Sequence, residues 1–254
     1  MGAYYPSEYS AYRSAIEDEH FGLMRWVRRR KLVTRRQLIE RYSGAQTGRL
    51  LDVGCATGLF LHEMALAGWG VVGVEPSPQA VTYAHERLGL EVFQGWLGDA
   101  PFEPASFDVV TYWDVLEHTF SPSAELACCA RLLKPGGLLA INVPNWDSVE
   151  RRLFGPYWNG FDPPRHLYTF KRPALTALLA QAALRPLVWM CFMSSYFSFI
   201  ISLDRWLKVR RPAWAAPVRR ALSFPGVRFL FEPWFWACNR LRQGGVIAVL
   251  ARKD

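Results

Sequence analysis

The stretch LLDVGCATGLFL, residues 50–61, decides the fold of this chain. Its apolar start predicts a short buried strand, its small residues predict a tight turn, and Leu59 to Leu61 predict the beginning of a helix. Glycine lets the backbone of such a turn approach a ligand closely, and the free N–H groups of a helix N-terminus point at that ligand. The stretch therefore predicts a ligand-binding turn between a strand and a helix.

Strands and helices are predicted to alternate outward from this turn. The predicted strands are 49–55, 70–76, 90–95, 107–113, 138–145, 185–193 and 244–253, and the predicted helices are 58–68, 77–89, 123–137 and 171–184. Such alternation predicts an α/β fold with a seven-stranded, mostly parallel sheet covered by helices on both faces. The aromatic and proline-rich segment 146–170 is expected to be loop rather than regular structure.

Two further segments frame this pattern. Residues 1–47 are predicted to form an N-terminal helical cap, and residues 48–254 are predicted to form the α/β domain. An aromatic and basic insertion, residues 195–243, separates the last two predicted strands. The uncharged stretch 186–203 is interrupted by proline and serines, which favours a strand followed by an amphipathic helix over a membrane span.

Composition limits the class of protein. A hydrophobic content of 51% over 254 residues excludes a disordered chain. The five cysteines have no paired spacing, so they indicate neither a zinc site nor a disulfide framework and suit a reducing compartment. The first twenty residues contain no apolar segment typical of a secretory signal. We therefore expect a cytoplasmic protein.

The net charge of +8 hides a strong asymmetry along the chain. Residues 50–150 contain three basic residues and thirteen acids, whereas Arg25 to Arg41 contains eight basic residues and one acid. Arg205 to Lys253 contains eleven basic residues and one acid. Such basic flanks are typical of contact with phosphate, on nucleic acid or on anionic lipid, and equally of solvated helix faces.

The glycine turn discriminates between two classes of cofactor. A dinucleotide fingerprint requires G-x-G-x-x-G, and this turn lacks that spacing. Asp52 instead precedes Gly54 by two positions, where an acid would repel a pyrophosphate and favour a cationic ligand. S-adenosylmethionine carries both a sulfonium and an ammonium group, so it is the cofactor that the turn favours.

The chain resembles the class I S-adenosylmethionine-dependent methyltransferases. Four stretches carry the resemblance in order along the chain: LLDVGCATG (50–58), GVEPS (73–77), FDVVTYWDVLEH (107–118) and LLKPGGLLAINVPN (132–145). A weaker likeness continues through RHLYTF (165–170) toward a bacterial subgroup similar to the ubiquinone-pathway O-methyltransferases. The resemblance implies a Rossmann-like sheet and S-adenosylmethionine as cofactor.

The resemblance also implies a set of cofactor-binding residues around the first two strands. Asp52 would orient the turn near the methionine ammonium group, and Gly54 and Gly58 would let the backbone pass against the cofactor. Glu75 ends the second strand, where a carboxylate can accept hydrogen bonds from both ribose hydroxyls, and Pro76 follows it.

The adenine end departs from the family pattern. Trp96 stands where many relatives carry an acid, so we expect it to stack on the adenine, with Leu97 and backbone beside it. Asp99 is an alternative polar contact, and Trp113 completes the expected cofactor site. Ala56 replaces a glycine common in the family, which is a mild change.

Two histidines are the predicted catalytic residues. Methyl transfer is an in-line displacement, and an oxygen nucleophile with a high pKa needs a base. Asp114, Glu117 and His118 would share one face of a helical turn after the fourth strand, so His118 can be that base. A second interpretation is that these three residues hold a divalent cation, but the expectation is that no metal is bound. A third is that Glu117 and His118 brace the loop. His166 is a second candidate base, whose alternative is a hydrogen bond to backbone.

The expected acceptor is a small-molecule or lipid-like apolar compound, methylated at oxygen. Aromatic residues could line its pocket: Tyr4, Tyr5, Tyr9, Tyr12, Trp113, Trp146, Tyr157, Trp158 and Phe161, with Trp206, Trp214, Phe229, Phe231, Trp234, Phe235 and Trp236 from the insertion. We expect the insertion to form a lid and to touch the inner membrane surface peripherally. An RNA methyltransferase is less favoured because no RNA-binding module is present, and a non-catalytic cofactor-binding protein is the third alternative. The oligomeric state is left open.

Overall fold

The computed structural model describes residues 22–192, 196–224 and 226–254, so the part of the predicted cap that precedes residue 22 lies outside the described residues. Its centre is one sheet of seven strands: β1 (Arg49–Val53), β2 (Gly70–Glu75), β3 (Val92–Gln94), β4 (Phe107–Trp113), β5 (Leu133–Pro144), β6 (Leu184–Met190) and β7 (Val246–Lys253). The strand order is β3-β2-β1-β4-β5-β7-β6, and β7 runs antiparallel to both of its neighbours. The predicted fold class is confirmed.

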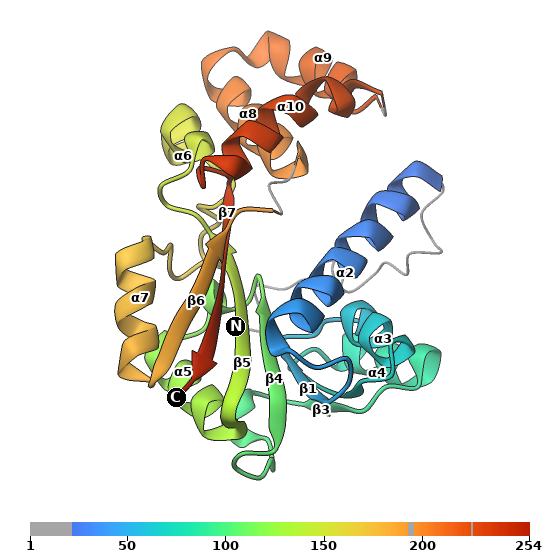
Figure 1. The fold of residues 1–254 in the computed structure, drawn as a ribbon. Coiled ribbons are helices and arrows are strands. Elements are labelled where there is room, and N and C mark those ends of the chain that lie inside the picture. The colour runs from blue at the N-terminus through green and yellow to red at the C-terminus, as the bar shows by residue number, and fades with distance from the viewer. Residues whose placement is uncertain (1–21, 193–195, 225) are drawn as a thin grey trace.

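Helices cover both faces of this sheet (Figure 1). One face carries α2 (Gly22–Ser43), α3 (Leu59–Leu66) and α4 (Pro78–Leu88), and the other carries α5 (Pro122–Leu132) and α7 (Arg172–Gln181). Successive residues of a strand pack into different hydrophobic cores, one on each face of the sheet, because side chains alternate across a strand. Leu50 belongs to the core that contains Ile39 of α2, whereas Leu51 belongs to the core that contains Leu126 of α5.

Local signals fix the ends of α4 as the sequence predicts. The hydroxyl of Ser77 accepts a hydrogen bond from the Ala80 N–H at 3.4 Å, and Pro78 occupies the first turn. Gly89 closes the helix with a φ of +64°, a left-handed conformation that glycine adopts without strain. The helix therefore begins at the residue after its cap and stops before β3.

Two elements differ from the expectation. A short helix, α6 (Val149–Phe154), forms in the segment expected to be loop, and its cap is Ser148, whose hydroxyl accepts from the Arg151 N–H at 3.1 Å. The helix α5 ends at Leu132 rather than at residue 137, because the fully buried Leu133 already pairs with Phe107 of β4.

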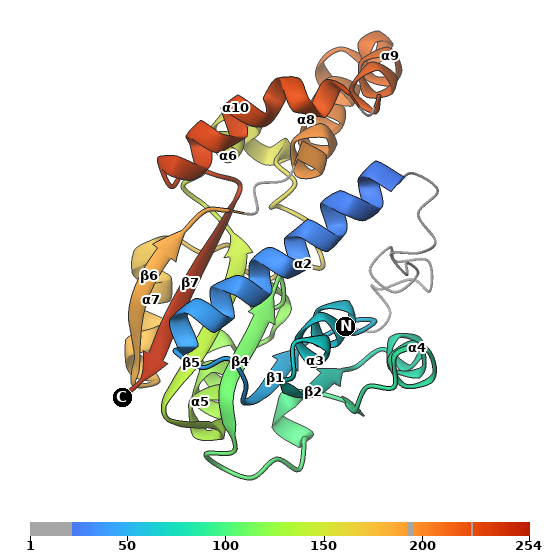
Figure 2. The same ribbon diagram turned by 45° about the vertical axis from the view of Figure 1, so that its right-hand side comes forward.

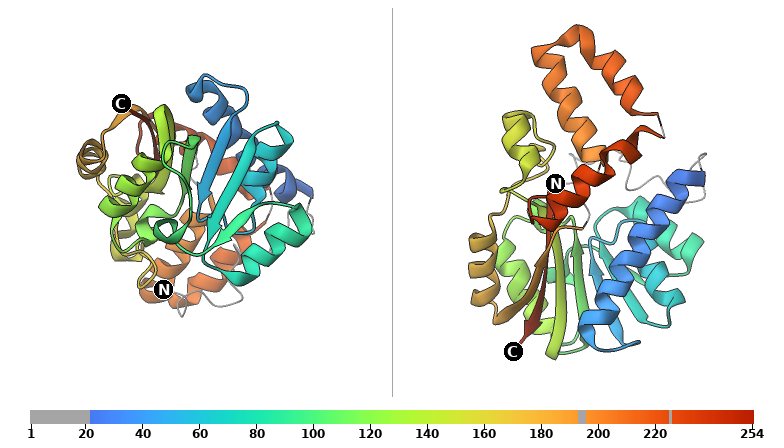
Figure 3. Two further views of the ribbon diagram at one scale, coloured as in Figure 1. Left: turned by 90° about the horizontal axis from the view of Figure 1, so that it is seen from below. Right: turned by 45° about the horizontal axis from the view of Figure 1, so that its top comes forward.

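The insertion forms three helices between β6 and β7: α8 (Tyr196–Arg210), α9 (Pro212–Leu222) and α10 (Val227–Arg240). They stand beyond the carboxyl ends of the parallel strands, as the right panel of Figure 3 shows. Helix α2 runs obliquely over the sheet with its amino-terminal end toward this insertion (Figure 2). Within the described ranges, every helix is too short or too polar to cross a bilayer.

Candidate active site

The turn between β1 and α3 requires glycine at two positions. Gly54 has a φ of +68° and Gly58 a φ of +79°, which are left-handed conformations. A Cβ atom at Gly54 would lie 2.6 Å from a methyl group of Val115, and one at Gly58 would lie 2.6 Å from a methyl group of Leu90. Both glycines are therefore needed to close the turn, independently of any ligand.

Two buried acids lie at the carboxyl ends of β1 and β2. Asp52 accepts a hydrogen bond from the Thr111 hydroxyl at 2.6 Å, and burial raises the pKa of Asp52 to about 7. Glu75 accepts from the N–H groups of Ala56 and Ser77, each at 2.9 Å, and burial raises its pKa. Glu75 thus braces the glycine turn, and the remaining lone pairs of its carboxylate stay compatible with the predicted ribose contact.

The residues predicted at the adenine end lie in different environments. Trp96 is 46% exposed and precedes the 3-10 turn η3 (Leu97–Asp99), so its ring is accessible. Leu97 is buried in the hydrophobic core, which leaves only its backbone for a cofactor. Pro76 is half-buried directly after Glu75.

A cavity of about 490 Å³ opens at the carboxyl ends of β1, β4 and β5. Among the predicted residues it is lined by Asp52, Gly54, Trp113, His118 and His166, whereas Gly58, Glu75, Pro76, Trp96 and Leu97 are not part of its lining. Helix α2 adds Arg28, Lys31, Leu32 and Arg35, and α8 adds Phe197 and Ser198. The cavity therefore joins the glycine turn, the cap helix and the insertion.

The aromatic lining differs from the expectation. Of the predicted aromatic residues that the structure describes, Trp113 alone lines the cavity, and Phe60 and Phe197 join it. Trp158 is fully buried instead and packs edge to face against Phe161 at 5.3 Å between ring centroids. Tyr4, Tyr5, Tyr9 and Tyr12 lie outside the described residues.

Arg35 is a cavity residue that the sequence analysis missed. Its guanidinium lies 4.6 Å from the centroid of the Trp113 ring and 3.3 Å from the carboxylate of Asp114. The spacing of Arg28, Lys31 and Arg35 places all three on one side of α2, and this periodicity was visible in the basic run. What the sequence could not show is that this side of α2 faces the glycine turn.

Asp114 lines the same cavity as Glu117 and His118, but its carboxylate pairs with other groups. It has a φ of +60° and lies before the single 3-10 turn η4 (Leu116–His118), and its second oxygen accepts from the Asn142 amide at 2.7 Å. The backbone reversal at Asp114 directs its carboxylate to Arg35. The alternative ligand trio of Asp114, Glu117 and His118 is therefore not the group that the structure brings together, which is Glu117, His118 and His166.

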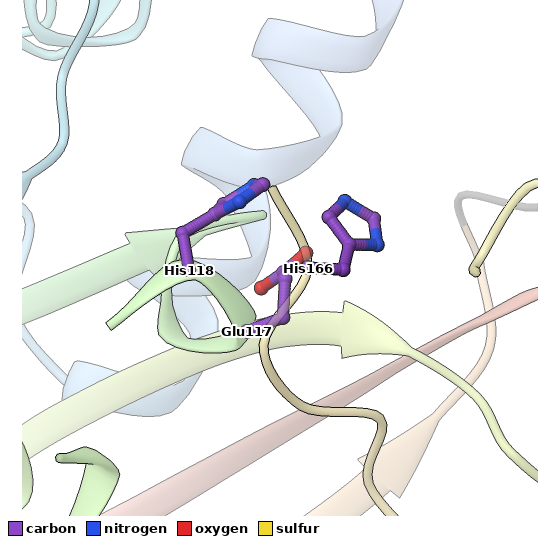
Figure 4. Close-up of side chains that lie close together, drawn as sticks. All are labelled: Glu117, His118 and His166. Carbon is purple, nitrogen blue, oxygen red and sulfur yellow. The ribbon is translucent and has the colours of Figure 1, made fainter. Parts of the chain in front are cut away.

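Glu117, His118 and His166 point toward one another from the turn after β4 and the loop before α7 (Figure 4). Their ligand atoms all lie within 4.8 Å of one another. The Nδ1–H of His118 donates to the carbonyl of Arg165 at 2.9 Å, and the Nδ1–H of His166 donates to the carbonyl of Gly160 at 2.9 Å. Since a carbonyl can only accept, each neutral ring keeps its lone pair on Nε2.

Burial sets the charge of this cluster. It lowers the pKa of His118 to about 4, with His166 adding to the effect, and it lowers the pKa of His166 in the same way. Both rings are thus neutral at pH 7. Burial raises the pKa of the Glu117 carboxyl well above its usual range, and among the described residues no group hydrogen-bonds to its Oε2. Each neutral ring can present the lone pair of its Nε2 to a proton or a cation.

Glu117 also supports the loop through its backbone. Its carbonyl accepts from the N–H groups of Leu167 at 2.9 Å and Tyr168 at 3.2 Å. Glu117 thus braces the loop through its main chain and His118 braces it through its Nδ1–H, so the bracing interpretation coexists with the chemical ones.

Comparison with known proteins gives one family match and partial relatives. A family described as methyltransferase domain matches residues 25–187. The ubiquinone biosynthesis O-methyltransferase of Cereibacter sphaeroides is 38% identical over 117 residues, which are 43% of this chain and 47% of the relative. The chain thus spans about half the length of the curated relatives it matches.

Solved structures share the fold at low sequence identity. A SAM dependent methyltransferase from Archaeoglobus fulgidus matches with a TM-score of 0.57 at 19% identity, covering 89% of this chain and 94% of that chain. Phosphoethanolamine N-methyltransferase 2 of Haemonchus contortus, solved in complex with S-adenosyl-L-methionine, matches with a TM-score of 0.57 at 17% identity, covering 87% of this chain and 52% of that chain. At these identities the likeness shows the fold.

Proposed function

This chain belongs to the methyltransferase domain family, as a class I enzyme whose cofactor is S-adenosylmethionine, and we propose that it methylates an oxygen of a small, apolar or lipid-like acceptor. The observation that carries the proposal is the neutral pair of His118 and His166 in the cavity that also contains the glycine turn. A neutral imidazole in that place can take a proton from an acceptor hydroxyl.

The cofactor would lie across the carboxyl ends of β1 and β2. The Gly54–Gly58 turn and Asp52 would hold its methionine part, Glu75 its ribose and Trp96 its adenine. Lys31 and Arg35 line the cavity from α2, where a cation can meet the cofactor carboxylate. S-adenosylmethionine supplies an electrophilic methyl group when bound.

The histidine pair supports an oxygen acceptor. A phenolic hydroxyl has a pKa of about 10, so it is a weak nucleophile at neutral pH until a base takes its proton. The acceptor oxygen would form a bond to the methyl carbon as the carbon–sulfur bond breaks, and its proton would pass to Nε2 of a histidine. The bound cofactor would supply the methyl carbon and leave as a neutral thioether, so the step balances. An amine acceptor, which carries its own lone pair when neutral, would need this base less.

A metal-assisted variant is the second candidate, and the cluster of Glu117, His118 and His166 is the observation that favours it. One carboxylate oxygen and two imidazole nitrogens suit a borderline divalent ion such as Zn²⁺ better than Mg²⁺, which prefers oxygen. Such an ion would acidify the acceptor hydroxyl. Both variants use the same side chains, and removal of metal distinguishes them.

The insertion would form a lid over the bound acceptor. It would also contact the cytoplasmic surface of the membrane. Phe197 and Ser198 of α8 line the cavity, which supports the lid. Trp214 and Trp236 are 63% and 68% exposed in a region rich in arginine, which supports contact with an anionic lipid surface. The proposal includes a boundary between a helical cap, residues 1–47, and the α/β domain, residues 48–254. Helix α2 of this cap supplies one wall of the cavity.

The test is a labelled-cofactor screen of the purified protein. Methyl-labelled S-adenosylmethionine is incubated with alkyl-substituted phenols and catechols, and in parallel with aliphatic amines and with total RNA. We expect label in the phenol and catechol products and none in RNA. Label confined to RNA would establish the RNA methyltransferase alternative. The non-catalytic alternative would be established if the protein binds the cofactor but labels no phenol, catechol, amine or RNA, with or without added metal.

A further inference from the structure

Helix α8 of the insertion contacts the loop that carries His166 through one polar face. We call residues 158–166 the histidine loop. Ser198, Ser202 and Arg205 follow one another at spacings of four and three residues, so they lie on the same side of α8. The Ser202 hydroxyl, which is fully buried, accepts from the Asn159 N–H at 2.8 Å, and the Asn159 amide donates to the Ser198 hydroxyl at 3.4 Å.

Arg205 makes the charged contact of this face. Its guanidinium donates to the carboxylate of Asp162 at 3.0 Å and to the carbonyl of Phe161 at 3.1 Å. A planar guanidinium serves two acceptors with fixed relative geometry, so this fork holds the backbone and the side chain of the loop together. Asp162 forms a second ion pair with Arg165, inside the loop itself. The exposed fraction of the Asp162 side chain is 19%, so water screens these ion pairs only in part.

Asp162 in turn organises the backbone that orients both histidines. Its carbonyl accepts from the N–H of Arg165 at 2.8 Å and of His166 at 3.0 Å, which closes a tight turn. The carbonyls on either side of this turn, at Gly160 and Arg165, receive the Nδ1–H groups of His166 and His118. The conformation of the histidine loop therefore decides which nitrogen of each ring carries the proton.

We infer that Arg205 is a positioning residue: through Asp162 it couples the docking of α8 over the cavity to the orientation and tautomer of His118 and His166. Arg205 of α8 binds the Asp162 carboxylate, and the Asp162 carbonyl accepts from the N–H groups of Arg165 and His166. The carbonyls of Gly160 and Arg165, which belong to the same turn, accept from the two rings. When α8 leaves the loop, the fork is lost and the carbonyls are no longer held. The histidine pair is thus assembled only while the insertion is docked. The inference rests on the proposed function for its catalytic consequence, and its structural part stands without it.

The first test reads the tautomers directly. Side-chain ¹⁵N spectra of histidine-labelled protein, assigned with His118→Gln and His166→Gln, report which ring nitrogen is protonated. In the wild type we expect Nδ1–H for both rings. In Arg205→Ala we expect a shift toward the Nε2–H form for both rings. Lys208→Ala is the matched control, because Lys208 is on the same helix but pairs with Asp204.

The second test separates positioning from folding and from the proposed function. Arg205→Lys restores the charge but not the fork, so its spectrum should lie between those of the wild type and Arg205→Ala. Asp162→Asn should reproduce Arg205→Ala, and the double variant should add little. With an acceptor found in the screen, Arg205→Ala should lower kcat about tenfold to a hundredfold while binding of S-adenosylhomocysteine is unchanged.

Each outcome bears on one idea. Wild-type tautomers in both Arg205→Ala and Asp162→Asn would overturn the inference, whatever the activity. Altered tautomers in a protein that methylates none of the screened acceptors would support the coupling and reject the proposed function. If kcat falls equally in Lys208→Ala, or if only KM changes in Arg205→Ala, the fork does not position the histidines.

Discussion

The imidazole rings of His118 and His166 meet edge to face, with their centroids 4.7 Å apart. At this distance a proton on one ring raises the cost of a proton on the other, and burial disfavours charge on both. Both rings of the pair therefore stay neutral at a pH where an isolated histidine is partly protonated. This relationship is the basis for two predictions about activity.

The first prediction concerns the pH profile of kcat. Because burial lowers the pKa of His118 to about 4, its neutral, proton-accepting form persists as the pH falls from 8 and is lost only as the pH passes through that value. We expect kcat to stay level between pH 8 and about pH 5.5, whereas an ordinary histidine base would lose activity below about 6.5. A measured midpoint near 6.5 would show that the base is solvated during turnover.

The second prediction concerns removal of the His118 side chain. His118→Ala should lower turnover by on the order of a hundredfold, since general base catalysis contributes roughly that factor. Affinity for S-adenosylhomocysteine, measured by calorimetry, should stay nearly constant, because the ring bonds to the histidine loop rather than to the glycine turn.

Other results assign His118 differently. If cofactor affinity and turnover collapse together, the residue braces the site. If a chelator abolishes wild-type activity and Zn²⁺ restores it, the metal interpretation of Glu117, His118 and His166 replaces that of a general base. In that case His166→Ala should be as damaging as His118→Ala, since each would remove one ligand.

The third prediction concerns Glu75, which accepts two backbone N–H groups of the glycine turn. Glu75→Ala should weaken S-adenosylmethionine binding by roughly 1.5–3 kcal/mol, the usual value of a lost charge-assisted hydrogen bond. It should also lower the melting temperature of the cofactor-free protein, since two N–H groups lose their acceptor. Reduced stability with unchanged cofactor affinity would restrict Glu75 to bracing and reject its contact with ribose.

The sheet could be predicted from the sequence, whereas the contents of the cavity could be predicted only in part. Alternating apolar runs and caps such as Ser77 act within a few residues, so they are visible in the chain itself. The backbone reversal at Asp114 depends on Arg35 and Asn142, residues that are distant in sequence. Local spacing therefore suggested a ligand trio that the fold does not assemble.

His166 illustrates the same limit in the opposite direction. The sequence identified it as a candidate base, but nothing local linked it to Glu117 and His118, which precede it by almost fifty residues. Its position depends on the contacts of Asp162 with α8, an element that follows it in the chain. Convergence of distant segments is set by packing, and a single sequence carries little information about it.

The fourth prediction concerns the accessible ring of Trp96. If it stacks on the adenine, Trp96→Ala should weaken S-adenosylhomocysteine binding by about 1–3 kcal/mol, the typical contribution of one stacked base. Trp236→Ala is the matched control, because that side chain is 68% exposed on α10, away from the glycine turn. If the wild type and Trp96→Ala bind S-adenosylhomocysteine equally well, Trp96 does not contact the adenine, and Asp99 or the backbone supplies that contact.

The fifth prediction concerns the exposed aromatic residues and arginines of the insertion. The insertion, residues 195–243, carries nine basic residues and two acids, so we propose an anionic lipid surface as its partner. The protein should sediment with vesicles that contain phosphatidylglycerol and far less with pure phosphatidylcholine. Each arginine at the surface is worth up to about 1 kcal/mol.

Two sets of variants separate the aromatic from the charged contribution to vesicle binding. Trp214→Ser with Trp236→Ser removes rings that are 63% and 68% exposed, and should weaken binding to both kinds of vesicle. Arg219→Gln with Arg220→Gln should remove only the preference for the anionic vesicles. Trp96→Ser is the control, because Trp96 is exposed but lies outside the insertion. Vesicle binding by Trp96→Ser should equal that of the wild type. If the wild type stays in the supernatant with both kinds of vesicle, the membrane contact is rejected, and the lid proposal is unaffected.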